Sequence, residues 1–584
     1  MANSEGAREA EADTYSGSEG PVAGVIGVVG AGTMGAGIAQ LACRAGAQAL
    51  LHDAIPEALE RGVQRVREGL AKEAARRQSA GTDRDAGEVE SAEAAFERLQ
   101  PVAELSQLAS CELVIEAAPE RLELKHELFG RLSEIVGAEC VLATNTSSLP
   151  VTAIAAGASN PSRVVGMHFF NPAPLMRLLE VVAGEQSAER ALGLAHATGE
   201  AMGKTVIRAS DGPGFLVNRC NRPFGLEALR LLQERLADVQ TIDRVCRMEG
   251  GFRMGPFELM DLVGIDTGLE VSKSFYAQSF GEPRWRPSPI TARYAAAGLH
   301  GRKTGRGYYD YAAQGDAQGG SRTAAYREQD PESLETAPPG HGEGVVVIAG
   351  EGVLAGELRA AAKRAGYEVR SPHDPTGGVL PALIVDCESA PAGEELPRGG
   401  PLERRGQPPP QGGANLLLVC AGSLNALDPG GSAVGFNVLP PLGEARLVEL
   451  TRGDASSPVA AARTERFFAA LGKHVEWVGD APGLVLGRIV CQVINESAFA
   501  LEEGVGSARD IDTGMVLGLN QPRGPLQWAD AIGLDRVLMV LEALCDEYRE
   551  ERYRPAPALQ RLVRAGRLGR ATGAGFFEYP AAAD

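Results

Sequence analysis

The chain has 584 residues and a formal net charge of −19, from 57 lysine and arginine and 76 aspartate and glutamate residues. This length is too great for one hydrophobic core and predicts several domains. The acidic field repels nucleic acid and anionic lipid, so neither is expected as a partner, although a local site could still take a small anion. No run of about 18 apolar residues occurs, so no membrane span is expected.

Residues 1–20 are acidic and rich in small residues, and they lack the apolar core of a signal peptide. We expect a disordered tail and a cytoplasmic protein. The cysteines show no CxxC spacing and several lie in apolar runs, which predicts buried free thiols and no metal site. These cysteines are Cys43, Cys111, Cys140, Cys220, Cys246, Cys387, Cys420, Cys491 and Cys545.

From residue 21 to 209, short apolar runs alternate with helical patterns. The runs "VAGVIGVVG", "AQALLHD", "ELVIEA", "CVLATN", "RVVGMHF", "RLLEVV" and "KTVIRA" predict strands, and residues 119–136 and 189–202 predict helices. Strands that alternate with helices indicate a mainly parallel sheet. This region is therefore expected to be an α/β domain.

The character of the sequence changes after residue 209. Long amphipathic stretches predict an all-helical domain over residues 210–311, and residues 312–343, rich in Gly, Pro and charge, predict a linker. A shorter α/β-like region follows at 344–479, with a polar insertion that begins at Glu388, and a second helical region occupies 480–584.

The second half of the chain repeats the first. "DGPGFLVNR" at Asp211 matches "DAPGLVLGR" at Asp480, an offset of 480 − 211 = 269. Glu227 and Glu496 keep that offset, and "GRKTGRGYYDY" near the end of the first half matches "GRATGAGFFEY" near the end of the second. We predict a Rossmann-type α/β domain and an all-α domain, followed by a degenerate tandem copy of both.

The glycine-rich segment "GVVGAGTMGAGIAQ" follows a predicted strand and opens a predicted helix. It contains Gly30-x-Gly32-x-x-Gly35, with Thr33 and Met34 inside the turn, and Asp53 ends the next strand. Glycines of this spacing let the backbone approach a pyrophosphate at the helix N-terminus, and an acid at the second strand binds ribose hydroxyls. Because the acid would repel a 2′-phosphate, NAD is predicted rather than NADP.

His168 lies at the carboxyl end of a predicted strand, the edge where ligands bind in open α/β sheets. Glu180 lies in the apolar strand "LLEVV", where a carboxylate is costly to bury without a partner. An imidazole oriented by a carboxylate is a general base with a fixed tautomer. A histidine that serves only the core is the structural alternative.

"GAGTMGAGIAQ", "NTSSL", "HFFNPAP", "LLEVV" and "DGPGFLVNR" occur in an order that resembles the L-3-hydroxyacyl-CoA dehydrogenase family. The match covers about residues 22–311, and the tandem arrangement resembles that of some bacterial 3-hydroxybutyryl- or 3-hydroxyadipyl-CoA dehydrogenases. The resemblance implies a His168–Glu180 dyad that oxidises a 3-hydroxyacyl-CoA with NAD. It also implies substrate contacts at Ser147 and Asn218.

The same resemblance implies a cofactor site lined by Glu120, Lys125 and Asn145, and an internal pseudo-dimer of the two helical domains, with a further homo-oligomer left open. The residues that contact CoA are not predicted, because the segment after Asp53 departs from the family pattern. For Ser147 the sequence supports a helix N-cap about as well as a substrate contact.

The second copy lacks most of the chemistry. Asn437 replaces His168, Gly487 replaces Asn218, and only Glu449 persists as the counterpart of Glu180. Its turn keeps Gly350-x-Gly352, but Ala355 replaces the third glycine, and no acid aligns with Asp53. We expect this half to be structural. Two alternative functions stay open for the whole chain: a dehydrogenase of a free hydroxy or sugar acid such as L-gulonate, and a non-catalytic NAD-binding structural protein.

Overall fold

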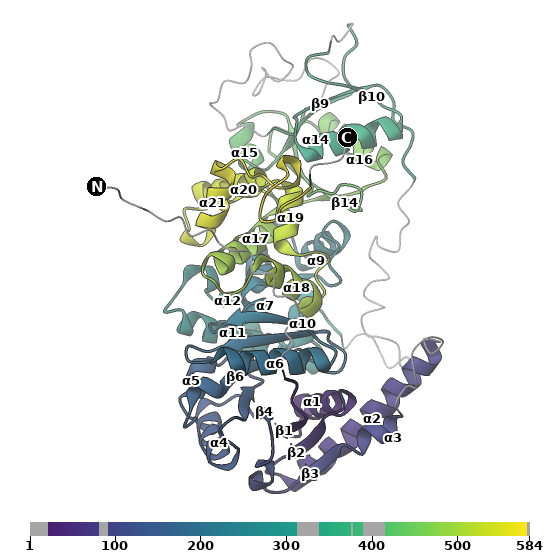
Figure 1. The fold of residues 1–584 in the computed structure, drawn as a ribbon. Helices are drawn as coiled ribbons and strands as arrows, with labels where there is room; N and C mark the ends of the chain where they lie inside the picture. The colour runs from purple at the N-terminus through teal and green to yellow at the C-terminus, as the bar shows by residue number, and fades with distance from the viewer. Residues whose placement is uncertain (1–20, 81–90, 312–337, 375–377, 389–414, 581–584) are drawn as a thin grey trace, which may run out of the picture. The chain divides into compact units, whose positions relative to one another are not determined.

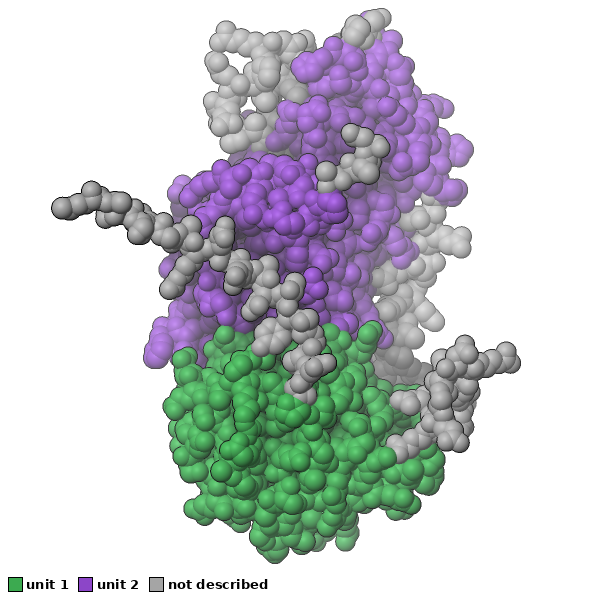
Figure 2. Space-filling model, in the orientation of Figure 1, with its two compact units in different colours: residues 1–211 green, residues 212–584 purple. Residues whose placement is uncertain are grey.

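The computed structural model describes residues 21–80, 91–311, 338–374, 378–388 and 415–580. The predicted tail, most of the predicted linker and most of the polar insertion lie outside these residues. The chain divides into two compact units, residues 1–211 and residues 212–584 (Figure 2). Each unit is described by itself.

The first unit is built on one sheet (Figure 1). Its strands are β1 (Val25–Val29), β2 (Gln48–His52), β3 (Leu99–Val102), β4 (Leu113–Glu116), β5 (Val141–Thr144), β6 (Val164–Phe169), β7 (Leu178–Ala183) and β8 (Thr205–Ser210). They lie in the order β3-β2-β1-β4-β5-β6-β7-β8, and only β6 and β7 are antiparallel. The first six strands follow the order of a dinucleotide-binding fold.

The helices of this unit are α1 (Thr33–Arg44), α2 (Pro56–Ala80), α3 (Ala92–Phe96), α4 (Leu122–Ile135), α5 (Val151–Ala155) and α6 (Glu189–Ala201), with the 3-10 turns η1 (Leu105–Leu108) and η2 (Pro161–Arg163). Apolar side chains of α1 and α6 form one buried core with those of β1, β6 and β7. All predicted strands are present. Strand β3 was not predicted, because it carries a proline and only Val102 of its four residues is buried.

The second unit opens with helices: α7 (Val217–Cys220), α8 (Arg222–Gln233), α9 (Val239–Met248), α10 (Pro256–Val263), α11 (Ile265–Gln278) and α12 (Pro289–Ala296), with η3 (Pro283–Trp285) and η4 (Arg302–Thr304). A second sheet follows, with β9 (Val345–Ala349), β10 (Glu368–Arg370), β11 (Leu383–Asp386), β12 (Asn415–Leu418), β13 (Val434–Asn437), β14 (Leu447–Arg452) and β15 (His474–Trp477). Its helices are α14 (Val353–Ala365), α15 (Leu424–Leu427) and α16 (Pro458–Ala470).

The second sheet has the order β10-β9-β11-β12-β13-β14-β15, and only β13 and β14 are antiparallel. This repeats the first sheet without a counterpart of β3 among the described residues. Residues 371–382 connect β10 to β11, where the first copy has α2, α3 and β3 between β2 and β4. The second α/β region, predicted to be the shorter one, therefore lacks these elements before β11 among the described residues.

The second unit ends with α17 (Leu486–Glu502), α18 (Ala508–Leu519), α19 (Pro525–Ile532), α20 (Leu534–Tyr548) and α21 (Pro557–Arg564), with η6 (Glu551–Tyr553) and η7 (Arg570–Thr572). Helix α17 is continuous where the first copy has the two helices α7 and α8. Pro223 explains the difference, because proline has no N–H to donate and interrupts a helix, whereas Gln492 stands at the same place in α17.

The two helical regions repeat individual contacts as well as elements. Asp261 accepts hydrogen bonds from the backbone N–H groups of Tyr308 and Tyr309, and Asp530 accepts them from Phe576 and Phe577. Buried carboxylates are stable in such places because backbone donors satisfy their oxygens. The shared contacts confirm the tandem copy that the sequence predicts.

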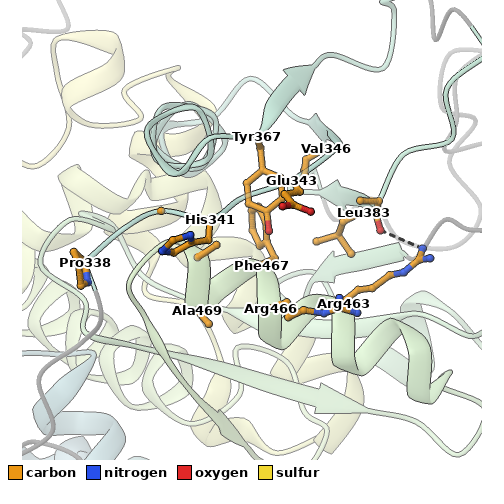
Figure 3. Close-up of a pocket in the computed structure, with 13 residues that line it drawn as sticks. Pro338, His341, Glu343, Val346, Tyr367, Leu383, Arg463, Arg466, Phe467 and Ala469 are labelled. Atoms are coloured by element: carbon orange, nitrogen blue, oxygen red, sulfur yellow. Dashed lines mark hydrogen bonds between the residues drawn. The ribbon is translucent and has the colours of Figure 1, made fainter.

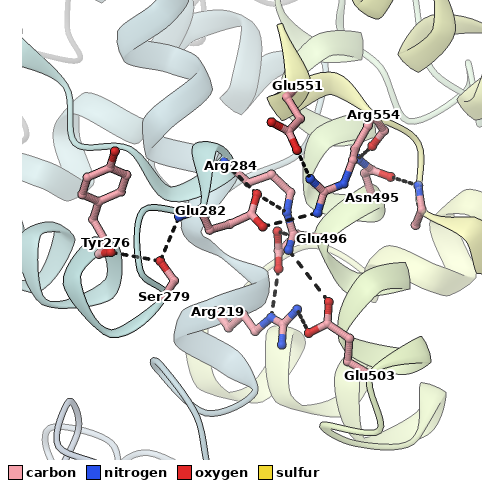
Figure 4. A network of polar contacts seen from close by, with 11 residues as sticks. Arg219, Tyr276, Ser279, Glu282, Arg284, Asn495, Glu496, Glu503, Glu551 and Arg554 are labelled. Atoms are coloured by element: carbon pink, nitrogen blue, oxygen red, sulfur yellow. Dashed lines mark hydrogen bonds and ion pairs between the residues drawn. The ribbon is translucent and has the colours of Figure 1, made fainter.

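Buried ion pairs join the two helical regions inside the second unit. The Arg219 Nε atom donates to Glu496 Oε1 at 2.9 Å, and Arg284 Nη1 donates to Glu496 Oε2 at 2.9 Å (Figure 4). Glu503 also pairs with Arg219, at 2.7 Å. The pairs of Glu496 with Arg219 and Arg284 thus join residues more than 200 positions apart in the sequence.

The reciprocal pair is also present. Arg488, the counterpart of Arg219, donates from Nε to Glu227 Oε1 at 2.9 Å, and Glu227 is the counterpart of Glu496. Tyr553 adds a hydrogen bond to the same oxygen at 3.1 Å. The two ion pairs are thus related to each other by exchange of the copies.

Two further expectations concern the whole chain. All nine cysteines are free thiols, and all are buried except the half-buried Cys545. Burial raises the pKa of several of them, as for Cys43, which reaches about 12, so they are protonated at neutral pH. No helix among the described residues is long and apolar enough to cross a membrane.

Candidate active site

The glycine turn between β1 and α1 has the geometry that its spacing predicts. Gly30 has a φ of +102°, a left-handed conformation that favours glycine, and a Cβ at Gly35 would lie 1.7 Å from the Gly30 carbonyl oxygen. A Cβ at Gly32 would meet nothing within 4 Å, and this N-cap residue offers α1 no side-chain hydrogen bond. The exposed N-terminus of α1 therefore suits a pyrophosphate.

Asp53 follows β2 and lies beside this turn. Its Oδ2 atom accepts a hydrogen bond from the Ala31 N–H at 2.8 Å, and its Oδ1 accepts one from Ile55 at 2.9 Å. Thr33 is exposed and Met34 is half-buried at the start of α1. The residues of the predicted fingerprint therefore gather at one edge of the sheet, and their contacts with NAD stay a prediction.

His168 and Glu180 lie directly opposite each other on the antiparallel strands β6 and β7. The His168 Nδ1 atom is 2.6 Å from Glu180 Oε2, the imidazole is 6% exposed and Glu180 is fully buried. The carboxylate accepts the Nδ1 hydrogen, which makes Nε2 the basic ring nitrogen. The geometry of the predicted pair is present.

Asn145 directly follows β5 and contacts the residue after His168. Its Oδ1 atom accepts a hydrogen bond from the Phe169 N–H at 2.8 Å, so the amide fixes the backbone that follows His168. The Phe170 ring lies 4.6 Å from the imidazole, centroid to centroid. Asn145 was predicted to line the cofactor site, and the structure gives it a contact that positions the strand of His168.

Lys125 is buried on α4 between two carboxylates. Its Nζ atom lies 2.7 Å and 2.8 Å from the two oxygens of Glu116 and 3.3 Å from Glu120 Oε2. Glu116 ends β4 and also accepts a hydrogen bond from Thr144 at 2.7 Å. Sequence reasoning missed Glu116. The signal was there, since "ELVIEA" places a carboxylate at the end of an apolar strand, where burial demands a partner.

Glu120 holds the loop that carries Ser147. Its Oε1 atom accepts hydrogen bonds from Thr146 Oγ1 at 2.6 Å, from the Ser147 N–H at 3.0 Å, and from the N–H and hydroxyl of Ser148 at 3.1 and 3.0 Å. Burial opposes ionisation, but the charge of Lys125 and these hydrogen bonds outweigh it, so the pKa of the Glu120 carboxyl is lowered.

Ser147 is exposed on this loop. The N-cap role that the sequence also allowed is wrong, because α5 begins at Val151 after Pro150. Its first N–H groups, of Val151 and Thr152, bond to Asp211 instead. Asn218 lies half-buried on α7, in the second unit, and its role stays a prediction.

The second copy shows how the carboxylate of the pair can persist without the histidine. Glu449 accepts hydrogen bonds from the N–H groups of Val485 and Leu486 at 2.7 and 2.8 Å, at the start of α17. Asn437 donates to the Gly483 carbonyl at 3.1 Å, and a Cβ at Gly487 would lie 2.8 Å from Asn437 Nδ2. Asn437, which stands in place of the histidine, packs against residues 483 and 487. Glu449 has a structural role, because it accepts hydrogen bonds at the start of α17.

The loop of Ser147 has also lost its polar groups in the second copy. Gly166 and Gly435 correspond, and they pair with Thr144 and Leu417 respectively. From this register, Leu418, Val419 and Cys420 occupy the places of Asn145, Thr146 and Ser147. The sheet therefore forms without this network.

A cavity of about 690 Å³ lies in the second α/β region, lined in part by Val346, Tyr367, Leu383, Arg463 and Phe467 (Figure 3). Arg463 is held there by a hydrogen bond from Nη1 to the Ala382 carbonyl at 3.3 Å. The cavity adjoins the amino ends of β9 and β11. Because ligands of open α/β sheets bind at the carboxyl ends, it is no counterpart of the His168 edge.

Comparison with known proteins agrees with this geometry. The family model for the NAD-binding domain of 3-hydroxyacyl-CoA dehydrogenase matches residues 25–212, and the model for the C-terminal domain matches residues 214–311 and again 483–579. The 3-hydroxyadipyl-CoA dehydrogenase of Escherichia coli K12 is 34% identical over 92% of this chain and 96% of its own length. A probable 3-hydroxybutyryl-CoA dehydrogenase of Deinococcus radiodurans is 38% identical over 49% of this chain and 99% of its own.

A solved structure resembles the whole arrangement. The crystal structure of 3-hydroxybutyryl-CoA dehydrogenase from Escherichia coli K12 aligns with a TM-score of 0.72 and 32% identity, over 93% of this chain and 99% of that one. Family models that match both helical regions, together with relatives that span nearly the whole chain, leave no ambiguity about ancestry. The chain belongs to the 3-hydroxyacyl-CoA dehydrogenase family of NAD-dependent enzymes.

Proposed function

We propose that this enzyme oxidises an L-3-hydroxyacyl-CoA to the 3-oxoacyl-CoA, reversibly, with His168 as the general base. The observation that carries the proposal is the 2.6 Å contact between His168 Nδ1 and Glu180 Oε2 at the carboxyl end of β6. This contact favours the tautomer in which Nε2 accepts a proton. The similar 3-hydroxyadipyl-CoA and 3-hydroxybutyryl-CoA dehydrogenases support a CoA thioester as substrate.

In the oxidation, His168 Nε2 removes the proton of the 3-hydroxyl group. Buried Glu180 keeps the ring in place and stabilises the positive charge that the imidazole gains. Ser147 and Asn218 are assigned to the substrate oxygen, which they orient by hydrogen bonds. NAD, when bound, supplies the hydride acceptor. The glycine turn of residues 30–35 and Asp53 are the residues that would hold it.

The assay compares three acceptors: NADH oxidation with acetoacetyl-CoA, acetoacetate and an oxo-sugar acid. Turnover with the thioester alone supports the proposal, whereas preference for a free acid would move the chain to the alternative substrate class. No turnover with any acceptor, combined with tight NADH binding, would indicate a non-catalytic NAD-binding protein.

We also propose that the two helical regions form an internal pseudo-dimer. The reciprocal pairs Arg219–Glu496 and Arg488–Glu227 support it, since each buries a charge of one copy against the other. A chain truncated after residue 311 would leave Arg219 and Glu227 without these partners. We expect that chain to dimerise or aggregate in light-scattering measurements, and a stable, fully active monomer would refute the proposal.

A further inference from the structure

The candidate site contains a chain of three charges, Glu116, Lys125 and Glu120, whose purpose neither the fold nor the proposed chemistry explains. Glu116 and Lys125 are buried, whereas the Glu120 side chain is 35% exposed. Lys125 is 1% exposed, and its ammonium group faces three carboxylate oxygens, two of Glu116 and one of Glu120. A lysine has three N–H donors. Two of them go to the Glu116 carboxylate, and Glu120 adds an ion pair, so carboxylates of the first unit hold the ammonium group in place.

Glu120, the last charge of this network, contacts the loop of Ser147. Glu120 presents one oxygen, Oε2, to Lys125 and the other, Oε1, to four donors of residues 146–148. Thr146 Oγ1 in turn accepts a hydrogen bond from the Leu149 N–H at 3.0 Å, so the network extends to residue 149. A single carboxylate thus ties the loop to the end of β4.

The second copy shows that this arrangement is not needed to build the sheet. It has Val419 and Cys420 in place of Thr146 and Ser147, and Asp386 at the end of β11, the strand that corresponds to β4. The remaining strands take the same order there. The Thr146 and Ser147 hydroxyls are therefore not needed to form that sheet.

We propose that Glu116 and Lys125 are positioning residues, which act through Glu120 to fix the 146–148 loop and the Ser147 hydroxyl against the substrate. This gives Lys125 a role different from a direct cofactor contact, and it adds Glu116 to the site. The inference rests on the proposed function, since Ser147 matters only if the substrate binds at this loop. Misplacing such a group by about 1 Å can cost on the order of 100-fold in rate.

The test measures kcat, KM for acetoacetyl-CoA and the Kd of NADH by fluorescence, for the full chain and its variants. Thr146→Val is the mildest change, because the second copy carries valine there. Lys125→Met and Glu120→Ala break the network further along, and Glu120→Gln keeps one oxygen for the loop. Glu127→Gln, at an exposed position on the same helix, is the matched control.

We expect Thr146→Val, Lys125→Met and Glu120→Ala each to lower kcat/KM for the thioester by roughly tenfold or more, with NADH Kd changed by less than about threefold. Glu120→Gln should recover part of the loss. The double variant Lys125→Met/Glu120→Ala should lose little more than Glu120→Ala alone, since both act through one carboxylate.

Two results would overturn the inference. One is a large rise in NADH Kd for Lys125→Met with kcat/KM for the thioester otherwise preserved, which would make the lysine a cofactor ligand. The other is near-normal kinetics for Thr146→Val, Lys125→Met and Glu120→Ala, which would make the network irrelevant to catalysis. A wild-type chain that is inactive on every acyl-CoA refutes instead the proposed function.

Discussion

The buried ion pair between Arg488 and Glu227 gives the sharpest test of how the second half stabilises the first. Arg488 is fully buried, and its Nε and Nη2 atoms lie 2.9 and 2.5 Å from Glu227 Oε1. Arg488→Met removes the charge and keeps much of the volume. It leaves Glu227 buried with the Tyr553 hydroxyl as its remaining partner, at 3.1 Å. Breaking a buried pair on one side costs about 3–5 kcal/mol.

A double variant separates two causes of the lost stability: the lost attraction within the ion pair, and the cost of burying Glu227 without its partner. In Arg488→Met/Glu227→Leu neither charge is buried alone, so we expect at least half of the lost stability to return, because buried pairs contribute little net stabilisation. Urea unfolding followed by tryptophan fluorescence reports on the right region, since Trp285, Trp477 and Trp528 all lie in the second unit.

The control is Arg549→Met, which removes an exposed pair with Asp546 at 3.6 Å and should cost no more than about 1 kcal/mol. The reasoning is refuted if Arg488→Met costs as little as the control. It is also refuted if the double variant is no more stable than the single one. The unpaired Glu227 carboxylate would then not be the cause of the lost stability.

Three further outcomes follow from the second copy. Asn437→His should leave kcat unchanged, because its surroundings lack the polar loop of the first copy; measurable gain of activity would contradict this. Titration should give one NADH per chain, since in the second copy Ala355 replaces the third glycine of the turn and Asn437 replaces His168; two equivalents would refute it. Burial, and then the charge of Glu449, raise the pKa of Glu249 well above its usual value, so the folded chain keeps this proton to a higher pH than the unfolded chain does. Stability should therefore fall as pH rises toward that raised pKa, by up to about 1.4 kcal/mol per pH unit, and Glu249→Gln should flatten the fall measured by urea unfolding; parallel slopes would exclude the group.

The strand pattern, the glycine turn and the His168–Glu180 pair could be predicted because each follows from local spacing. Apolar runs define strands, and an acid in such a run demands a partner, which the register of β6 and β7 supplies. The same argument applied to Glu116 would have required a partner for it, but would not have identified Lys125. That pairing depends on where α4 lies relative to the end of β4, which periodicity does not reveal.

The contacts of Glu449 and Asn145 could be identified only from the three-dimensional structure. Glu449 keeps its place without a histidine because it binds the N–H groups that open α17, a contact between segments 36 residues apart in sequence. The sequence showed only that the glutamate persisted. Asn145 was assigned to the cofactor by resemblance, and that role stays a prediction; its hydrogen bond with the Phe169 N–H is a contact that the sequence did not show.

The central claim is that His168 is the base of an acyl-CoA dehydrogenation. The most direct measurement is NADH oxidation with acetoacetyl-CoA at 340 nm, for the wild-type chain and for His168→Gln, alongside NADH binding. We predict robust turnover for the wild type, and for the variant a loss of about 100-fold or more with NADH affinity retained. A His168→Gln variant that turns over at near the wild-type rate would contradict the account.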